Sequence, residues 1–388
     1  MNNLHICLRM VGSWEWVGGM VYIQNLAWAI ANLPEEEKPG VELSVAVPQA
    51  QSAFVEPVRG RVDRVYQERV FDRAYAKIAK ILAAHVRFIP RRLLNPHKFD
   101  FVYPDVAGAR APYLWGGWIP DFQHYHLPEL FSPKEINFRN NFCKKRADHA
   151  AVIILSSRMA QEDFGSLFPK DAHRSALLNF VSWIDPEWFH ENPKAYQEKY
   201  GITEDFFLVA NQFWKHKDHR VVIDALALLK QQGIQPTVVC TGSTSDYRHP
   251  DYFKELLVRI QQSGLEDRVR VLGFIPRLDQ VQLMRQSLAV IQPSRFEGWS
   301  TVVEEARSLG KTILLSDFPV HLEQNPPNSY FFERGNAEEL ACLMAKVSSS
   351  AGSTPDFEKE KIARLDNLER LKIFGNNFLQ IVRRATGR

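Results

Sequence analysis

Short apolar runs alternate with longer amphipathic stretches along the whole chain. Runs rich in Val, Ile and Leu predict strands, and apolar residues that recur every three or four positions predict helices. In the first half we expect strands at Leu4–Arg9, Glu42–Pro48, Phe99–Tyr103, Ala151–Leu155 and Ser175–Leu178, and helices at Met20–Leu33, Asp72–Val86, Pro133–Arg146 and Ser157–Phe164. In the second half we expect strands at Phe206–Ala210, Thr237–Cys240, Val269–Leu272, Ala289–Gln292 and Thr312–Leu315, and helices near His219–Gln231, Tyr252–Gln262, Leu278–Gln286, Thr301–Leu309 and Phe357–Arg384.

This alternation predicts an α/β fold with parallel sheets that helices cover on both faces. The 388 residues are too many for one ordinary core, and the proline-containing stretch 182–202 has no clear period. We therefore expect two Rossmann-like domains facing across a cleft, at 1–181 and 203–355, and a helical segment 356–388 that packs back on the first domain. In such folds, ligands bind at the carboxyl ends of the strands.

Composition and charge exclude some classes of binding partner and site. The net charge of +3 is too small to indicate nucleic acid, and the four scattered cysteines show no spacing typical of a zinc site or a disulfide framework. No apolar run approaches the roughly 20 residues of a membrane span. We expect a cytoplasmic protein. The basic segment 77–98 allows two interpretations, a peripheral contact with an anionic membrane or a helix with a solvated basic face.

The segment 292–310 carries the strongest chemical signal. A predicted strand ends there, a loop with Glu297 and Gly298 follows, and a helix starts near Ser300 or Thr301. The first N–H groups of such a helix suit a phosphate, and carboxylates such as Glu297 and Glu305 accept hydrogen bonds from sugar or ribose hydroxyls. A plain capped helix would give the same local pattern.

Glu304 has a separate interpretation. The spacing of Thr301 and Glu304 fits a capping box, in which the fourth residue folds back onto the N–H group of the cap. This pattern predicts a structural role for Glu304.

Several motifs together resemble one enzyme family. The stretch Phe296–Glu305 resembles the E-x7-E motif of the retaining glycosyltransferases of family 4, which have the GT-B fold. The other matching segments are Gly18–Gly19, Thr241–Ser243, Leu272–Ile275, Gln292–Ser294 and Gly310–Asp317. The resemblance covers most of the chain and is closer in the C-terminal half.

The resemblance implies roles for particular residues. Glu297 would contact the donor sugar, Glu305 would hold the ribose hydroxyls, and Lys217 would neutralise the departing diphosphate. Backbone N–H groups near the start of the helix would bind the diphosphate. The further donor-site positions that it implies are Gly18, Gly19, Gln212, Gly242, Phe274, Ile275, Gly298, Trp299, Ser300, Thr301 and Val302.

Two positions depart from the family pattern. Gln212 stands where the family usually has an arginine, so the phosphate clamp loses one charge unless Lys215 or another group replaces it. Pro120 stands where the family usually has a histidine, next to Asp121, which matches the family's aspartate. We assign the histidine's role to His124. His124 and His126 also have the spacing of a metal pair, but no third ligand is evident.

As implied by the resemblance, the protein is a hexosyltransferase that uses a UDP- or GDP-sugar and retains the anomeric configuration. It needs no metal or other cofactor, and a donor phosphate oxygen takes the acceptor proton. The acceptor would be a glycan or a lipid-linked saccharide in cell-surface polysaccharide or lipopolysaccharide biosynthesis. Trp14 and Trp16 allow two interpretations, stacking on the sugar rings of the acceptor or ordinary burial in the core. Two alternatives remain on the same scaffold: a non-catalytic sugar-nucleotide-binding partner and a sugar-nucleotide epimerase.

Overall fold

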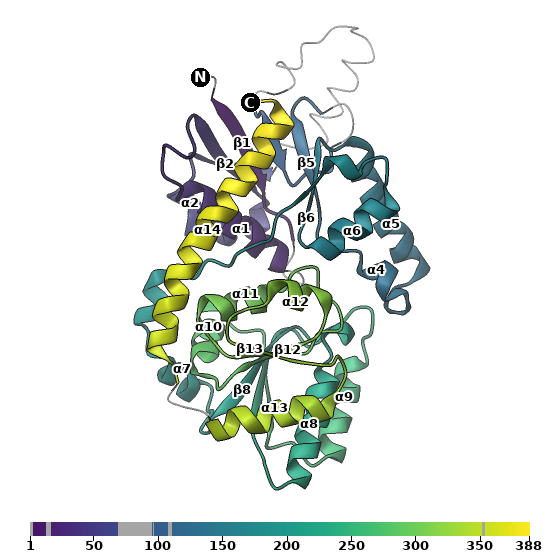
Figure 1. Ribbon diagram of the computed structural model, residues 1–388, viewed down its shortest axis with the longest axis vertical. Helices are drawn as coiled ribbons and strands as arrows, with labels where there is room; N and C mark the ends of the chain where they lie inside the picture. Colours follow the sequence, from purple (N-terminus) through teal and green to yellow (C-terminus); the bar gives the residue numbers. More distant parts are fainter. Residues whose placement is uncertain (1–2, 13–16, 69–94, 96, 108–110, 351–353) are drawn as a thin grey trace. The chain divides into compact units, whose positions relative to one another are not determined.

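A computed structural model describes residues 3–12, 17–68, 95, 97–107, 111–350 and 354–388. The expected helix Asp72–Val86, Trp14, Trp16 and nearly all of the basic segment 77–98 lie outside the described residues. The contacts divide the chain into two compact units (Figure 1). The N-terminal unit comprises 1–122, 133–181 and 369–388, and the C-terminal unit comprises 123–132 and 182–368.

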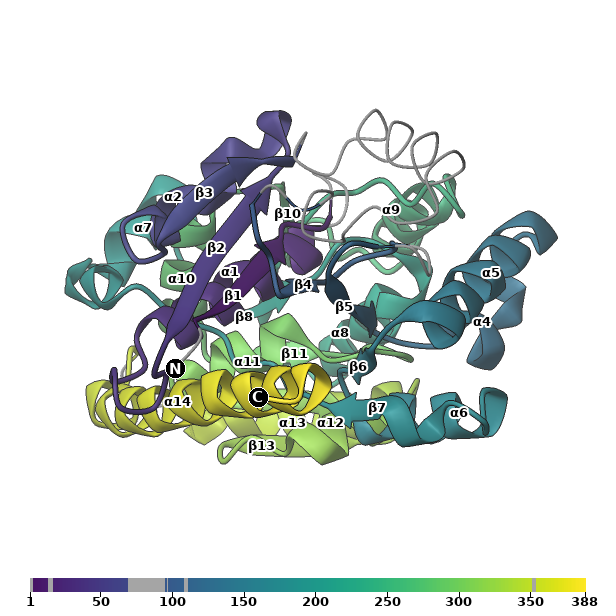
Figure 2. The same cartoon turned by 90° about the horizontal axis from the view of Figure 1, so that it is seen from above.

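The N-terminal unit is built on one parallel sheet with the order β3-β2-β1-β4-β5-β6-β7 (Figure 2). Its strands are β1 (Leu4–Arg9), β2 (Val41–Val47), β3 (Arg64–Gln67), β4 (Phe101–Tyr103), β5 (Leu114–Ile119), β6 (Val152–Leu155) and β7 (Ser175–Leu177). Its α-helices are α1 (Val17–Ala31), α2 (Glu56–Arg59), α5 (Pro133–His149) and α6 (Arg158–Leu167).

Two strands of this sheet were not expected from the sequence. β3 is a short, partly exposed edge strand with little apolar signal. β5 contains Gly116 and Gly117, which weaken its strand pattern. A Cβ atom at Gly116 would lie 2.8 Å from the Tyr103 side chain, and one at Gly117 would lie 2.9 Å from the Arg146 side chain. The glycines therefore allow neighbouring side chains to pack directly onto the backbone of β5.

The C-terminal unit has a second parallel sheet, with the order β10-β9-β8-β11-β12-β13. Its strands are β8 (Phe206–Ala210), β9 (Thr237–Thr241), β10 (Val269–Gly273), β11 (Val290–Gln292), β12 (Ile313–Ser316) and β13 (Ser329–Phe332). Its α-helices are α4 (Gln123–His126), α7 (Pro193–Lys199), α8 (His219–Gln231), α9 (Tyr252–Gln262), α10 (Arg277–Gln286), α11 (Thr301–Ser308), α12 (Pro319–Gln324) and α13 (Ala337–Ser350).

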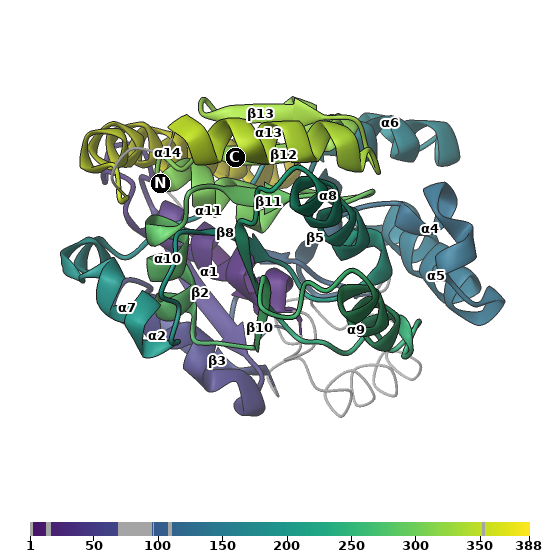
Figure 3. The ribbon, with the colours of Figure 1, turned by 90° about the horizontal axis from the view of Figure 1, so that it is seen from below.

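Two apolar clusters lie on the two faces of this sheet. One joins the strands to α8, α9 and α13, which lie over them in Figure 3. The other joins the strands to α10 and α11. Because both faces are covered, the central strands β8 and β9 are fully buried and mostly apolar, as expected for a parallel sheet.

The last helix, α14 (Phe357–Thr386), is a single element that contributes to both units. Residues 357–368 belong to the C-terminal unit and 369–388 to the N-terminal unit. The predicted α/β fold class with two parallel sheets is confirmed by the strand orders. One boundary differs from expectation: Gly18 and Gly19 lie inside the first turn of α1 and not before it, because that helix begins at Val17.

Candidate functional site

The strand order of the C-terminal unit creates a switch point between β8 and β11, where the connections run in opposite directions along the sheet. Such points are the usual ligand sites of open α/β sheets. The first residue after β8, Asn211, donates a hydrogen bond to the side chain of Gln292 at the end of β11 (2.8 Å). The N–H group of Arg295 also donates to the carbonyl of His216 (2.8 Å), so the loops after the two strands are joined.

Lys217 and Glu297 meet at this switch point. The distance from Lys217 Nζ to Glu297 Oε1 is 2.6 Å, and the side chains are 18% and 8% exposed. The same carboxylate oxygen accepts a hydrogen bond from Gln292 Nε2 (2.7 Å). Two residues singled out separately from the sequence are therefore paired, and Gln292 adds a connection that the sequence did not reveal.

The start of α11 differs from the expected capping box. The N-cap is Ser300, whose hydroxyl accepts from the N–H group of Val303 (3.4 Å), so the predicted cap at Thr301 is wrong. Glu304 is buried and accepts a hydrogen bond from Gln324 Nε2 (3.0 Å). Gln324 Oε1 also accepts from the N–H group of Ser300 (3.2 Å). Glu304 thus helps to fix α11 through α12 instead of through the cap.

The next N–H groups, those of Thr301 and Val302, belong to the first turn of α11 and precede its intrahelical hydrogen bonds. Gly298 and Trp299, which lead into the helix, are partly exposed. This arrangement combines a partly exposed approach, a helix N-terminus and the nearby Lys217 ammonium group. Together these features suit an anion such as a diphosphate.

Glu305 lies one turn further along α11 and is 4% exposed. Its carboxylate accepts a hydrogen bond from Arg277 Nε (3.1 Å), at the first residue of α10. The same guanidinium donates to the carbonyl of Trp183 (3.0 Å) and lies over the ring of Trp188. No sequence pattern indicated Arg277, which lies 28 positions before Glu305 in the chain.

The loops after β8, β9 and β10 are hydrogen-bonded to one another along the carboxyl edge. The N–H group of Gly242 donates to the carbonyl of Gly273 (2.8 Å). A Cβ atom at Gly242 would lie 2.5 Å from the carbonyl oxygen of Asn211 and 2.8 Å from the nitrogen of Gln212, so only glycine fits. Beyond β10, Phe274 is 60% exposed and Ile275 is buried. These positions form a continuous backbone edge with one exposed aromatic ring.

The segment 123–132 belongs to the C-terminal unit and brings its two histidines to different environments. His124 is buried, close to the ring of Phe131. His126 is exposed, and its ring centroid lies 5.4 Å from that of Phe296, the residue before Glu297. The sequence predicted a functional role for His124, which is buried in the structure. The exposed His126 lies beside the loop that contains Glu297.

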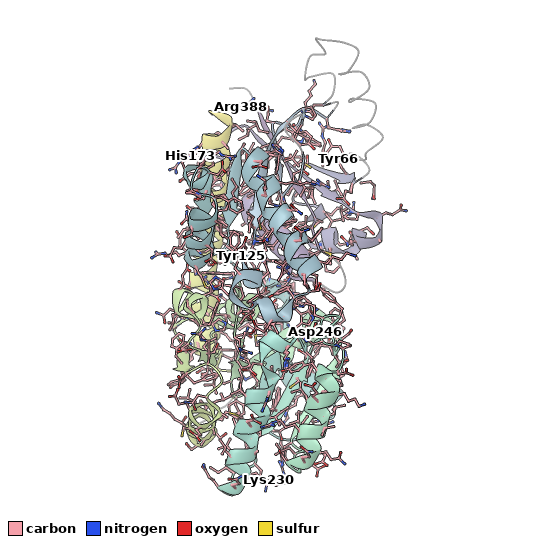
Figure 4. All side chains as sticks on the ribbon, turned by 90° about the vertical axis from the view of Figure 1, so that its right-hand side faces the viewer. Tyr66, Tyr125, His173, Lys230, Asp246 and Arg388 are labelled. Carbon is pink, nitrogen blue, oxygen red and sulfur yellow. The ribbon has the colours of Figure 1, made fainter. Side chains whose placement is uncertain are left out.

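A buried arginine joins this segment to the loop after β9. Arg248 lies over the rings of Phe131 (4.7 Å) and Trp214 (4.9 Å) and pairs with Asp246 (3.7 Å). Asp246 Oδ2 also accepts from the N–H group of Lys215 (3.1 Å). Figure 4 shows Asp246 at the opposite end of this unit from Lys230, which lies in the last turn of α8.

The remaining predicted site residues lie in the N-terminal unit. Asp121 follows β5 and lies 3.7 Å from Arg139. Trp118 on β5 stacks on Tyr22 of α1 with a centroid distance of 4.3 Å. The structure thus connects the early turns of α1, which contain Gly18 and Gly19, with the end of β5.

Burial also places an uncharged histidine next to the ion pair. His321 on α12 is completely buried, which lowers its pKa to about 4, although the Glu297 carboxylate acts in the opposite direction. Its Nδ1 lies 3.1 Å from the carbonyl oxygen of Ser316, which fixes the proton on that nitrogen. His321 is therefore neutral at pH 7, and no sequence pattern indicated it.

Among the described residues, no group of three or more His, Cys, Asp or Glu side chains could share a metal ion. Within the same part of the chain, none of the helices combines the length and apolar character needed to cross a membrane.

The C-terminal unit is similar to known glycosyltransferases. Residues 194–364, which include Lys217, Glu297 and Glu305, match the family model of glycosyl transferases group 1. The chain is 34% identical over 182 residues to a D-inositol 3-phosphate glycosyltransferase of Jonesia denitrificans, covering 44% of this chain and 42% of that protein. It is 23% identical over 254 residues to a mannosylfructose-phosphate synthase of Agrobacterium fabrum, covering 58% and 54%. The chain thus spans about half the length of these curated relatives.

Solved structures share the fold over the whole chain. HepE of Anabaena in complex with UDP and glucose has a TM-score of 0.65 and 20% identity, covering 98% of this chain and 99% of that one. The lipopolysaccharide outer core galactosyltransferase WaaB has a TM-score of 0.59 and 16% identity, covering 98% and 99%. The architecture is therefore that of GT-B glycosyltransferases.

Proposed function

We propose that the protein is a retaining glycosyltransferase of family 4 that transfers a hexose-type sugar from a nucleotide sugar to a glycan or lipid-linked saccharide. The observation that carries the proposal is the Lys217–Glu297 pair at the switch point, within the region that matches glycosyl transferases group 1. Complexes of HepE with UDP and with UDP-glucose favour a UDP-sugar as donor. We further propose a role in cell-surface polysaccharide biosynthesis in the cytoplasm; the proteins of similar fold include the lipopolysaccharide outer core galactosyltransferase WaaB.

The donor diphosphate would lie between the Lys217 ammonium group and the first N–H groups of α11, at Thr301 and Val302. Glu297 holds Nζ of Lys217 in place before the donor arrives, because the two groups are 2.6 Å apart. Once bound, the diphosphate competes for the same cation. The carboxylate of Glu305, oriented by Arg277, accepts hydrogen bonds from the ribose hydroxyls.

In the proposed reaction, the bond between the anomeric carbon and the diphosphate breaks, and the acceptor oxygen bonds to that carbon on the same face. The acceptor proton goes to a donor phosphate oxygen. The protein contributes by positioning the donor and by stabilising the charge that develops on the leaving diphosphate. No metal or other cofactor takes part in this scheme.

One observation favours a second function. Gln212 is neutral at the position where the family usually has an arginine, so the cationic clamp is weaker than usual. A weaker clamp favours a non-catalytic sugar-nucleotide-binding partner. Both proteins would bind the nucleotide sugar, but only the glycosyltransferase would release nucleoside diphosphate from it.

A thermal-shift screen with UDP-, GDP-, ADP- and dTDP-sugars, followed by measurement of nucleoside diphosphate release, tests the proposal. The enzyme should be stabilised by one donor class and should release its diphosphate slowly in water. Binding without release, even with acceptor, would favour the partner. Conversion of UDP-N-acetylglucosamine without acceptor would indicate an epimerase, and an inverted anomeric carbon in the product would contradict retention.

A further inference from the structure

Gln292, the last residue of β11, is completely buried, and its side chain takes part in three hydrogen bonds. Its Oε1 accepts from Asn211 Nδ2 (2.8 Å). Its Nε2 donates to Glu297 Oε1 (2.7 Å) and to Ser294 Oγ (3.1 Å). Because a side-chain amide has one acceptor oxygen and two N–H donors, each polar group of Gln292 has a partner. The amide is therefore held in one position.

The charge of Glu297 sets the direction of these hydrogen bonds. An ionised carboxylate only accepts hydrogen bonds, and Nζ of Lys217 lies 2.6 Å from the same oxygen, Oε1. Nε2 of Gln292 must therefore face Glu297, and its Oε1 must face Asn211, which presents an N–H group. The three side chains form a directed chain of hydrogen bonds that ends on Oε1 of Glu297.

Packing alone does not account for a polar side chain at the end of β11. The residues before Gln292 on this strand, Val290 and Ile291, are buried and apolar. A buried amide loses its hydrogen bonds to water, and this loss is costly unless protein partners replace them. The partners of Gln292 come from the loops that follow β8 and β11. Its polar groups therefore order these two loops, which carry Lys217 and Glu297.

The two oxygens of the Glu297 carboxylate are used differently. The hydrogen bonds from Lys217 and Gln292 both go to Oε1. Within the part of the chain that the structure describes, Oε2 accepts no hydrogen bond. The carboxylate is thus fixed through one oxygen, and the other can accept a hydrogen bond from a hydroxyl group of a ligand.

We infer that Gln292 is a positioning residue of the donor site. Its amide shares Oε1 of Glu297 with the ammonium group of Lys217, so that Oε2 is presented to a hydroxyl group of the donor sugar. Because the amide is uncharged, it orients the carboxylate without placing a second negative charge near the donor diphosphate. The inference rests on the proposed function, in which Glu297 contacts the sugar and Lys217 the diphosphate.

The variant Gln292→Glu tests this role because it changes the chemistry of the side chain and keeps its shape. At high pH the new carboxylate lies against that of Glu297, and the two compete for Lys217. Two carboxylates so close share one proton, because each disfavours the ionisation of the other. As the pH falls, the protonated carboxyl group donates to Glu297 as the amide does. The loss of activity should therefore be largest at high pH.

The rate of nucleoside diphosphate release, divided by that of the unchanged protein at the same pH, measures this effect. For Gln292→Glu we expect a loss of at least about tenfold at about pH 8 and of less than about threefold at about pH 5.5. Gln292→Met cannot donate a hydrogen bond at any pH and should lose about fivefold or more at both. Gln262→Glu, the same change at an exposed position of α9, is the matched control and should lose nothing.

One titratable group on a neighbouring element lies near this pair. His321 of α12 has its pKa lowered to about 4 by burial, so in the unchanged protein it stays neutral between about pH 5.5 and pH 8. The pH dependence of the Gln292→Glu ratio therefore reports on the introduced carboxyl group and its partner Glu297.

A role of Gln292 in stability alone gives a different result. Both Gln292 variants would then melt at lower temperatures but release diphosphate at the normal rate when folded, and that result overturns the inference. A loss in Gln292→Glu that does not change with pH also overturns it. If the unchanged protein releases no diphosphate from any donor, the proposed function fails. The affinities for UDP and GDP, measured by calorimetry at the two pH values, then decide the inference by the same comparison, and a protein without affinity for either overturns both.

Discussion

Replacement of Lys217 by methionine should affect stability and activity through the same atoms. The variant leaves the Glu297 carboxylate buried with its hydrogen bond from Gln292 but without its cation. Removal of one partner from a buried ion pair costs about 3–5 kcal/mol. Because Lys217 is 18% exposed and Gln292 remains, we expect a smaller loss, about 2–3 kcal/mol in the free energy of unfolding.

For a unit of this size, that loss lowers the melting temperature by roughly 5 °C or more. The release of nucleoside diphosphate should fall at least about tenfold, equivalent to ~1.4 kcal/mol in the barrier, because the leaving group loses its counter-charge. Differential scanning calorimetry measures the first effect, and a coupled assay for released diphosphate measures the second. Lys254→Met, at an exposed lysine of α9, is the matched control and should change neither by much.

The double variant Lys217→Met/Glu297→Gln separates the two effects. Because it removes both charges, the free energy of unfolding should return to within about 1 kcal/mol of the original value, while activity stays low. Recovery of activity in the double variant would refute the proposed role of Lys217 in stabilising the diphosphate. A Lys217→Met variant with unchanged stability and activity would refute the whole site assignment.

Four further predictions concern residues around the Lys217–Glu297 pair. Arg277→Gln should raise the donor KM more than it lowers kcat, because Glu305 loses its orienting partner; steady-state kinetics with varied donor concentration measures both constants. Glu305→Ala should lower the rate of sugar transfer at least about tenfold. Glu304→Ala should lower stability by about 1 kcal/mol, because buried Gln324 loses one of its hydrogen bonds. Denaturant titration that shows no loss would contradict the packing described. Burial lowers the pKa of His219 to about 3, so the folded protein holds this side chain in its neutral form at neutral pH. The stability that this contributes is lost as pH falls from about 6.5 towards 3, because the histidine of the unfolded chain takes up a proton first. A His219→Leu variant should therefore show a weaker dependence of the free energy of unfolding on pH over that range.

Local sequence periodicity was sufficient to predict most of the C-terminal unit. The bounds of β8, α8 and α9 agree with the expected ranges because their apolar patterns begin and end sharply. β5 was missed because its two glycines serve close packing and not a turn. The edge strand β13 was missed because its partly exposed pattern resembles a loop.

The pairings within the candidate site could not be read from the sequence, because they depend on the order of strands in the sheet. Lys217 and Glu297 are 80 positions apart and meet only because β8 and β11 are neighbours. The contacts of Gln324 with α11 and of Arg277 with Glu305 depend in the same way on how α12 and α10 pack. The motif spacing located the residues, and the topology determined their partners.

A crystal structure of the protein with a bound nucleoside diphosphate would show where the leaving group lies. The terminal phosphate should lie within hydrogen-bond distance of Nζ of Lys217 and of the first N–H groups of α11, with the ribose beside Glu305. A diphosphate bound away from the carboxyl ends of β8 and β11 would contradict this placement.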